Sequence, residues 1–112
     1  MHLNIGIDIE QVGRFKNKGK RLLEKIFSKK ELKMMKSHNA HHLTGIFCAK
    51  EAVIKACNPV KKLQLKDIGI FHRRDGSPYA VIKSNPMIAR NLKISISHSK
   101  DYAVAVAILS AK

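Results

Sequence analysis

The sequence predicts an α+β fold in which a small antiparallel sheet packs on a long buried helix. Helical spacing of apolar residues prevails in the first half of the chain, and the alternation typical of strands prevails in the second half. The segment from about Ala40 to Asn58 is apolar on nearly every side, and a helix that is hydrophobic all round is a buried helix. No repeat or linker divides the 112 residues, so we expect one domain over residues 1–112.

The first element is a predicted strand over Leu3–Ile9. Leu3 and three isoleucines point to one side of this strand, and Asp8 points to the other side near its end. A single apolar side indicates a half-buried strand. We expect it to join the sheet that the second half of the chain forms.

Three helices follow. Lys20–Phe27 has helical spacing with an apolar face. Ser28–Glu31 has the pattern of a capping box, which predicts a second helix that runs to about Lys36. Asn39 can cap the long central helix, and the Asn58-Pro59 pair ends it.

The second half has the patterns of four strands and one short helix. The strands are expected over Asp67–His72, Tyr79–Lys83, Lys93–His98 and Tyr102–Leu109, and a helical turn over Asn85–Arg90. The turn-rich residues 73–78 join the first two strands, and the last two form a predicted hairpin. In the third strand Ile94 and Ile96 face the core, and His98 lies on their side at the strand's end.

The charge of the chain is strongly positive and unevenly distributed. Twenty-two Lys and Arg residues against eight Asp and Glu residues give a formal charge of +14. Arg14–Lys36 contains ten basic residues and two acidic ones, so this stretch alone carries +8. Such a balance points to an anionic partner: nucleic acid, an anionic membrane, an acidic protein or a phosphorylated ligand.

The cysteines and the N-terminus predict a cytoplasmic location. Cys48 and Cys57 would lie about 13 Å apart along one helix, which is too far for a disulfide, so we expect both to be buried and reduced. Asp8 and Glu10 interrupt the region where a signal peptide would be apolar. No apolar run is long enough for a transmembrane helix.

Two carboxylates and a lysine are the candidate chemical groups. Glu51 and Lys55 are four residues apart on the central helix, and their pattern fits a surface salt bridge as well as a functional site. Asp8 could serve only to cap its strand. Asp8 and Glu51 together are oxygen ligands suited to a hard cation such as Mg²⁺, and Lys55 would then face phosphate oxygens bound to that ion.

Five segments of the chain resemble a known family. They are Gly6–Glu10, Phe27–Leu32, Phe47–Ala56, Asp75–Tyr79 and Ile94–Ala105. In this order and spacing they resemble the holo-acyl-carrier-protein synthases, which are the small stand-alone 4′-phosphopantetheinyl transferases. The likeness covers essentially the whole chain, and its most specific part is Gly-x-Asp followed by Lys-Glu-Ala-x-x-Lys.

The resemblance implies a magnesium-dependent transfer of the 4′-phosphopantetheine arm of coenzyme A to a serine of apo acyl carrier protein. The product left behind would be adenosine 3′,5′-bisphosphate, and the reaction would serve fatty acid biosynthesis. Asp8 and Glu51 look like the metal ligands, and Glu51 and Lys55 look like the catalytic residues. Lys55 would chiefly grip the phosphates, and the serine proton would go either to Lys55 or to a metal-bound water held by Glu51. Gly76 and Pro78 resemble the loop along the adenine. His98 resembles a contact to a coenzyme A phosphate, although it could be a packed edge histidine.

The resemblance also implies partners. Members of this family form homotrimers with active sites between neighbouring subunits. The acidic acyl carrier protein would dock on Arg14–Lys36, where Arg14 is our best single docking residue, and we expect no nucleic-acid or membrane partner. Ile46 replaces the family's usual arginine, and residues 58–60, Asn-Pro-Val, replace its glycine-rich phosphate turn. Lys61 and Lys62 could compensate for that turn electrostatically.

Three other interpretations remain open at this point. The charge suits a basic nucleic-acid-binding module, but the chain has few aromatic residues for stacking on bases. The altered phosphate turn suits a catalytically lapsed relative of the family. His38, His41 and His42 could form a zinc site, although no cysteine or acidic residue accompanies them.

Overall fold

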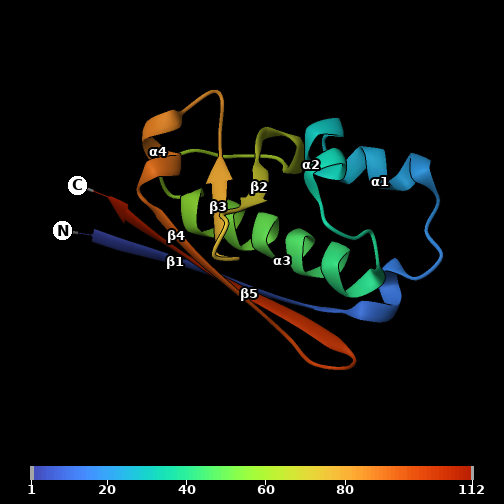
Figure 1. Cartoon of the computed structure of the whole chain (residues 1–112). Helices are drawn as coiled ribbons and strands as arrows, with labels where there is room; N and C mark the ends of the chain where they lie inside the picture. Colours follow the sequence, from blue (N-terminus) through green and yellow to red (C-terminus); the bar gives the residue numbers. More distant parts are fainter. Residues whose placement is uncertain (1, 112) are drawn as a thin grey trace.

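A computed structural model describes residues 2–111 of the protein. Figure 1 shows one long helix with a sheet along one of its sides and a short hairpin on the other. In chain order the elements are strand β1 (His2–Gln11), 3-10 helix η1 (Val12–Phe15), helices α1 (Lys20–Ile26), α2 (Lys29–Met34) and α3 (Ala40–Cys57), 3-10 helix η2 (Leu65–Asp67), strands β2 (Gly69–His72) and β3 (Pro78–Val81), helix α4 (Pro86–Arg90), and strands β4 (Leu92–His98) and β5 (Tyr102–Ala111).

The main sheet has three antiparallel strands in the order β1-β5-β4. The predicted C-terminal hairpin is confirmed, with His98 paired to Ala103 at its closed end. The first strand joins this sheet, as expected, and pairs with β5 over its whole length, from His2 opposite Ala111 to Gln11 opposite Tyr102. The first and last strands of the described chain therefore lie side by side.

The expected strands of the second half divide between two sheets. β2 and β3 pair only with each other, in a separate two-stranded sheet. Both are shorter than predicted, because Asp67 lies in η2 and β3 ends at Val81. The turn between them is formed by Gly76, which has a φ of +89°, and by Asp75, whose carboxylate accepts a hydrogen bond from the Ser77 backbone N–H at 2.9 Å.

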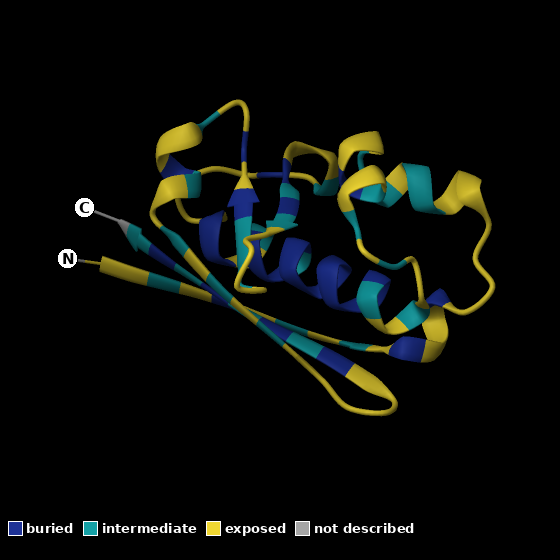
Figure 2. Ribbon diagram, viewed as in Figure 1, coloured by how far each residue is buried: buried dark blue, intermediate teal, exposed yellow. Residues whose placement is uncertain are grey.

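Helix α3 is the buried centre of the fold, as the sequence predicts. Figure 2 shows most of it buried between the two sheets. It begins at the predicted cap, where the Asn39 side chain accepts a hydrogen bond from the His42 N–H at 2.8 Å, and it ends at Cys57, just before Asn58-Pro59. Both cysteines are free and buried, and burial raises the pKa of Cys48 to about 12 and that of Cys57 to about 11.

Small residues bring α3 close to the main sheet. Ala103, Ala105 and Ala107 of β5 are fully buried beneath the helix. On β1, a Cβ atom at Gly6 would lie only 1.9 Å from the carbonyl oxygen of Ala52. Because only a glycine fits there, the side of β1 that carries Gly6 and Asp8 is the side that faces the helix.

The apolar side of β1 therefore points away from the core. The side chains on this side, those of Leu3 and the three isoleucines of β1, are between 58% and 65% exposed. Each of the three isoleucines lies opposite an apolar residue of β5. We call this surface the outer sheet face; it consists of Leu3, Ile5, Ile7, Ile9, Val104, Val106 and Ile108. Nothing within residues 2–111 covers it, and a contiguous apolar surface of this kind marks an interaction site.

Helix α2 lies beside strand β2, and helix α1 lies beside η2. The capping box is confirmed: the Glu31 N–H donates to Ser28 Oγ at 3.0 Å, and the Ser28 N–H donates to Glu31 Oε1 at 2.9 Å. Helix α2 ends at Met34, two residues before the predicted end. None of the helices within residues 2–111 is long and apolar enough to cross a membrane.

Candidate active site

Asp8 and Lys55 meet where β1 crosses α3. The Nζ atom of Lys55 donates a hydrogen bond to the carbonyl oxygen of Ile7 at 2.9 Å and lies 3.5 Å from Asp8 Oδ1. The close approach of the strand and the helix at Gly6 makes this contact possible. The Lys55 side chain is 53% exposed and that of Asp8 is 11% exposed, so the lysine lies at the mouth of the site and the carboxylate lies deeper.

The Asp8 carboxylate is only partly satisfied. Its Oδ2 atom is buried and has no hydrogen-bond partner among the described residues. Burial and the neighbouring Glu10 carboxylate raise the pKa of Asp8, and Lys55 offsets only part of that effect. A buried carboxylate oxygen without a partner costs free energy, and a bound cation would remove that cost.

Glu51 lies one helical turn before Lys55 and is half-buried. Within residues 2–111 it forms no ion pair, because the ion pairs there join Arg14 to Glu10, Lys50 to Glu31 and Lys55 to Asp8. The interpretation of Glu51 and Lys55 as a salt bridge is therefore wrong. Among residues 2–111 its carboxylate forms no ion pair, so its predicted role as a second metal ligand stays a prediction.

These donors fit a magnesium ion. Magnesium is bound in proteins by one or two carboxylates, and it keeps its other positions for water and substrate phosphates. Asp8 and Glu51 supply two carboxylates, one of which has an unpartnered buried oxygen. Among residues 2–111 there is no group of three or more His, Cys, Asp or Glu side chains placed to hold a metal ion, so a site enclosed by protein ligands is not formed.

The histidines proposed as a zinc site are engaged separately. His38 Nε2 is hydrogen-bonded to the carbonyl oxygen of Leu32 at 2.6 Å, and His41 Nε2 to that of Lys100 at 2.9 Å. His42 lies beside His72 instead, with 5.5 Å between the ring centroids. The described structure therefore gives no support to the zinc hypothesis.

The three remaining predicted site residues lie elsewhere in the chain. His98 packs over the first half of α3, where a Cβ atom at Gly45 would lie 2.4 Å from its Nε2 atom. Gly76 and Pro78 belong to the β2–β3 hairpin. Gly45 and Lys55 are ten residues apart, or about 15 Å along a helix, so His98 is distant from the Asp8–Lys55 contact.

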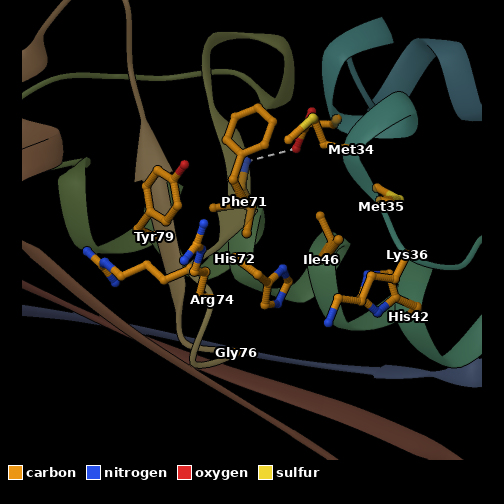
Figure 3. A pocket seen from close by; sticks show the side chains of 13 residues that line it. Met34, Met35, Lys36, His42, Ile46, Phe71, His72, Arg74, Gly76 and Tyr79 are labelled. Atoms are coloured by element: carbon orange, nitrogen blue, oxygen red, sulfur yellow. Dashed lines mark hydrogen bonds between the residues drawn. The ribbon is translucent and has the colours of Figure 1, made fainter.

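A cavity of about 440 Å³ lies between α2, α3 and the β2–β3 hairpin (Figure 3). We call it the hairpin cavity. It is lined by Glu31, Met34, Met35, Lys36, His42, Ile46, Ile70, Phe71, His72, Arg73, Arg74, Gly76 and Tyr79. Ile46, which the sequence marked as a departure from the family pattern, lies in its wall, and so does Gly76 of the predicted adenine loop.

Lys50 and Glu31 form a fully buried ion pair that sequence reasoning missed. Lys50 Nζ lies 2.6 Å from Glu31 Oε1 and also donates to the carbonyl oxygen of Ile26 at 2.8 Å. Glu31 Oε2 accepts a hydrogen bond from the Ile70 N–H at 2.9 Å. The sequence does contain an indication of this pair, because a lysine in the most apolar part of the central helix requires a buried partner.

The basic stretch Arg14–Lys36 is accessible. All ten of its Lys and Arg residues are exposed. Arg14 is held in place by an ion pair with Glu10 at 2.7 Å and by the ring of Phe47, whose centroid lies 5.2 Å from the guanidinium carbon. A cationic surface therefore extends from the edge of the candidate active site over α1 and α2.

Comparison with known proteins places these features in a family. The sequence profile of the 4′-phosphopantetheinyl transferase superfamily matches residues 4–107. The holo-[acyl-carrier-protein] synthase of Thermodesulfovibrio yellowstonii is 39% identical, in an alignment that covers 95% of this chain and 96% of that protein. The one from Caldicellulosiruptor saccharolyticus is 42% identical and covers 96% of both.

Solved structures agree with the sequence comparison. The holo-[acyl-carrier-protein] synthase of Helicobacter pylori, determined in complex with coenzyme A, has a TM-score of 0.79 and 31% identity, with 95% of this chain and 99% of that chain covered. A coenzyme A complex of the synthase from Chronobacterium ammoniagenes has a TM-score of 0.81 and 25% identity, with 100% and 99% covered. The chain belongs to the 4′-phosphopantetheinyl transferase superfamily and, within it, to the holo-[acyl-carrier-protein] synthases.

Proposed function

We propose that this chain transfers the 4′-phosphopantetheine arm of coenzyme A to a serine of an apo acyl carrier protein, with magnesium as cofactor. The family supplies the reaction class, and the relatives' names supply the two substrates. The observation that carries the proposal is the buried Asp8 carboxylate with an unpartnered oxygen, which lies in contact with Lys55. Adenosine 3′,5′-bisphosphate is the expected second product.

Asp8 and Glu51 would hold the magnesium ion. When bound, the ion polarises the phosphoryl group under attack and neutralises charge that develops on the leaving phosphate. Phosphoryl transfer depends chiefly on positioning and charge stabilisation, and a site with two carboxylates and one lysine supplies both.

Lys55 would grip the phosphate oxygens of coenzyme A. Its ammonium group is half exposed, and its present partners are a backbone carbonyl and Asp8, so it can turn toward an incoming phosphate if the magnesium ion then compensates the Asp8 carboxylate. We assign the second catalytic role to Glu51, whose carboxylate would orient a water molecule that takes the proton of the carrier serine.

A homotrimer would complete the site. Within one chain, Asp8, Glu51 and Lys55 form one group, and Gly76, Pro78 and His98 lie in another region. The outer sheet face is apolar and begins on the same strand that carries Asp8. Packing of this face against neighbouring copies would bury it, and active sites between subunits would then join the two groups of residues.

The acyl carrier protein would dock on the basic stretch Arg14–Lys36. The carrier proteins are acidic, and charge complementarity raises association rates and selects partners. Arg14 lies close to the reacting groups, because its partner Glu10 is two residues from Asp8 on the same side of β1. We further propose that residues 1–112 form one catalytic domain, and a cytoplasmic location remains a prediction.

Phosphate binding after α3 would differ from the family pattern. The backbone N–H groups of Val60 and Lys61 both donate to the carbonyl oxygen of Cys57 at 2.8 Å, so they close the end of the helix and are not free for a ligand. Lys61 and Lys62 are exposed and would supply charge in their place.

Intact-mass spectrometry of an apo acyl carrier protein tests the proposal. Incubation with this protein, coenzyme A and Mg²⁺ should add one phosphopantetheine group, and EDTA or the substitution Glu51→Ala should abolish the addition. Lys83→Ala, at an exposed lysine just after β3 to which no role is assigned, serves as the control and should retain transfer. No addition with several carrier proteins and a folded sample would favour the catalytically lapsed interpretation. A gel shift with RNA or DNA in that sample would favour the nucleic-acid-binding module.

A further inference from the structure

Two histidines face each other in the wall of the hairpin cavity. His42 lies in the first turn of α3 and His72 at the end of β2, and their ring centroids are 5.5 Å apart with an interplanar angle of 33°. Figure 3 shows both rings at the cavity, below Ile46. His42 is half-buried and His72 is exposed, so the pair lies where a ligand from solvent can reach it.

The charged groups around this pair are almost all cationic. Lys36, Arg73 and Arg74 line the same cavity, and His38 and His98 lie near His42. Glu31 is the one carboxylate among the residues that line the described cavity. Its oxygens are already occupied by Lys50 at 2.6 Å and by the N–H groups of Ser28 and Ile70 at 2.9 Å. Asp75 in the hairpin turn interacts with Arg73, whereas Lys36 and Arg74 form no ion pair among residues 2–111, so the cavity keeps an excess of positive charge.

These surroundings disfavour protonation of both histidines in the free protein. Burial lowers the pKa of His42, and the neighbouring His72, His98, His38 and Lys36 lower it further. His72 is exposed on one side only, and the desolvation of its other side, with a contribution from Lys36, lowers its pKa as well. A bound anion would oppose both causes by charge attraction, so the pair would take up a proton as the anion entered.

The remaining wall is apolar. Met34, Met35, Ile46, Phe71 and Tyr79 supply aliphatic and aromatic surface beside the cationic groups. Such a cavity suits a ligand that has a flat or apolar body and one highly charged anionic group. A phosphate monoester on a nucleoside has this chemistry, and it is a dianion above about pH 6.

We propose that His42 and His72 together bind a phosphate monoester dianion in the hairpin cavity and take up a proton as it binds. This inference rests on the proposed function, since it assigns the 3′-phosphate of coenzyme A as the group bound. Ile46 stands where the family usually has an arginine, so α3 contributes no permanent positive charge to the cavity at this position. The histidine pair supplies a positive charge that depends on pH. The two histidines then determine the preference for coenzyme A over dephospho-coenzyme A, which lacks this phosphate.

The sign of the pH dependence follows from the direction of proton uptake. The free histidines are neutral at neutral pH, and the bound state holds an additional proton, so affinity falls as the pH rises. One linked proton changes the dissociation constant by up to about tenfold per pH unit between the pKa of the free pair and that of the bound pair. Dephospho-coenzyme A should show almost none of this dependence.

Isothermal titration calorimetry with the full chain and Mg²⁺ tests the inference. Titrations from about pH 6.5 to 8 in two buffers of different ionisation enthalpy give the number of protons taken up. We expect proton uptake with coenzyme A and little with dephospho-coenzyme A. The double variant His42→Gln/His72→Gln should lose most of the preference for coenzyme A, apart from what Lys36, Arg73 and Arg74 contribute, and should lose the pH slope. His41→Gln, a histidine bonded to Lys100 outside the cavity, should behave as the unsubstituted protein.

The outcomes separate this inference from the proposed function. If the double variant, shown to be folded by circular dichroism, keeps both the preference for coenzyme A and the pH slope, the histidine pair is not the phosphate site. The same conclusion follows if the unsubstituted protein binds coenzyme A without proton uptake. If the protein neither binds coenzyme A nor modifies a carrier protein, the proposed function itself fails, and the inference fails with it.

Discussion

Replacement of Lys50 by methionine should sharply destabilise the protein. Methionine has a similar length, so the change removes a charge and leaves little empty volume. Glu31 would stay fully buried, with the N–H groups of Ser28 and Ile70 as its remaining partners. Removal of one partner from a buried ion pair costs about 3–5 kcal/mol, because the other charge is left uncompensated.

This loss is large for a domain of 112 residues. Small domains have a total stability of about 5–15 kcal/mol. At about 4–8 °C per kcal/mol, a loss of 3 kcal/mol would lower the Tm by roughly 12–24 °C. Urea denaturation followed by circular dichroism measures the change, provided that the slope of the transition stays constant between variants.

Two further variants make this measurement decisive. Lys55→Met is the same substitution on the same helix, at a side chain that is 53% exposed, and it should change stability by no more than about 1 kcal/mol. The double variant Lys50→Met/Glu31→Gln removes both charges and should recover much of the loss. A single Lys50→Met variant as stable as Lys55→Met would refute the reasoning, because it would show that Glu31 does not depend on its partner.

Three other predictions concern the site and its partners. Asp8→Asn should abolish transfer and raise the Tm of the metal-free protein at neutral pH. The pKa of Asp8 is raised in the folded state, so ionisation of Asp8 lowers stability once the pH exceeds its unfolded-state pKa. Asparagine cannot ionise and removes that cost. Ile7→Asp on the outer sheet face should yield a folded monomer in analytical ultracentrifugation and no activity in the transfer assay. Met87→Asp, at a similarly exposed residue of α4, should keep the oligomer. Arg14→Glu should raise the KM for the carrier protein, leave the KM for coenzyme A unchanged, and reduce the salt dependence of transfer.

Local patterns in the sequence predicted most of the elements, because the interactions that form them are local. The capping box at Ser28 and Glu31, the cap at Asn39 and the hairpin between β4 and β5 each involve residues close in the chain. The predicted family, fold class and transferase activity are confirmed by the comparisons. The site residues Asp8, Glu51, Lys55, Gly76, Pro78 and His98 stay predictions as to their roles.

The features that the sequence did not reveal depend on contacts between distant segments. The alternation of apolar and polar residues along β1 predicts a strand, but it does not show which side of the strand faces the helix. The close contact between Gly6 and Ala52 places the other side, the apolar one, toward solvent. The Lys50–Glu31 pair joins residues 19 positions apart. The separation of β2 and β3 from the main sheet likewise depends on how both pack around α3, which no local pattern encodes.

The pairing of β1 with β5 has a consequence for synthesis of the protein. The central strand of the main sheet follows every other described element in the chain, so a ribosome makes it after all of them. Until it emerges, β1 and β4 have no partner, and the underside of α3 lacks the alanines that cover it. Contacts between such distant segments fold slowly, and unpaired strand edges promote aggregation. A nascent chain therefore cannot complete its core before β5 has emerged, and shielding of its apolar helix by a chaperone would be most valuable until then.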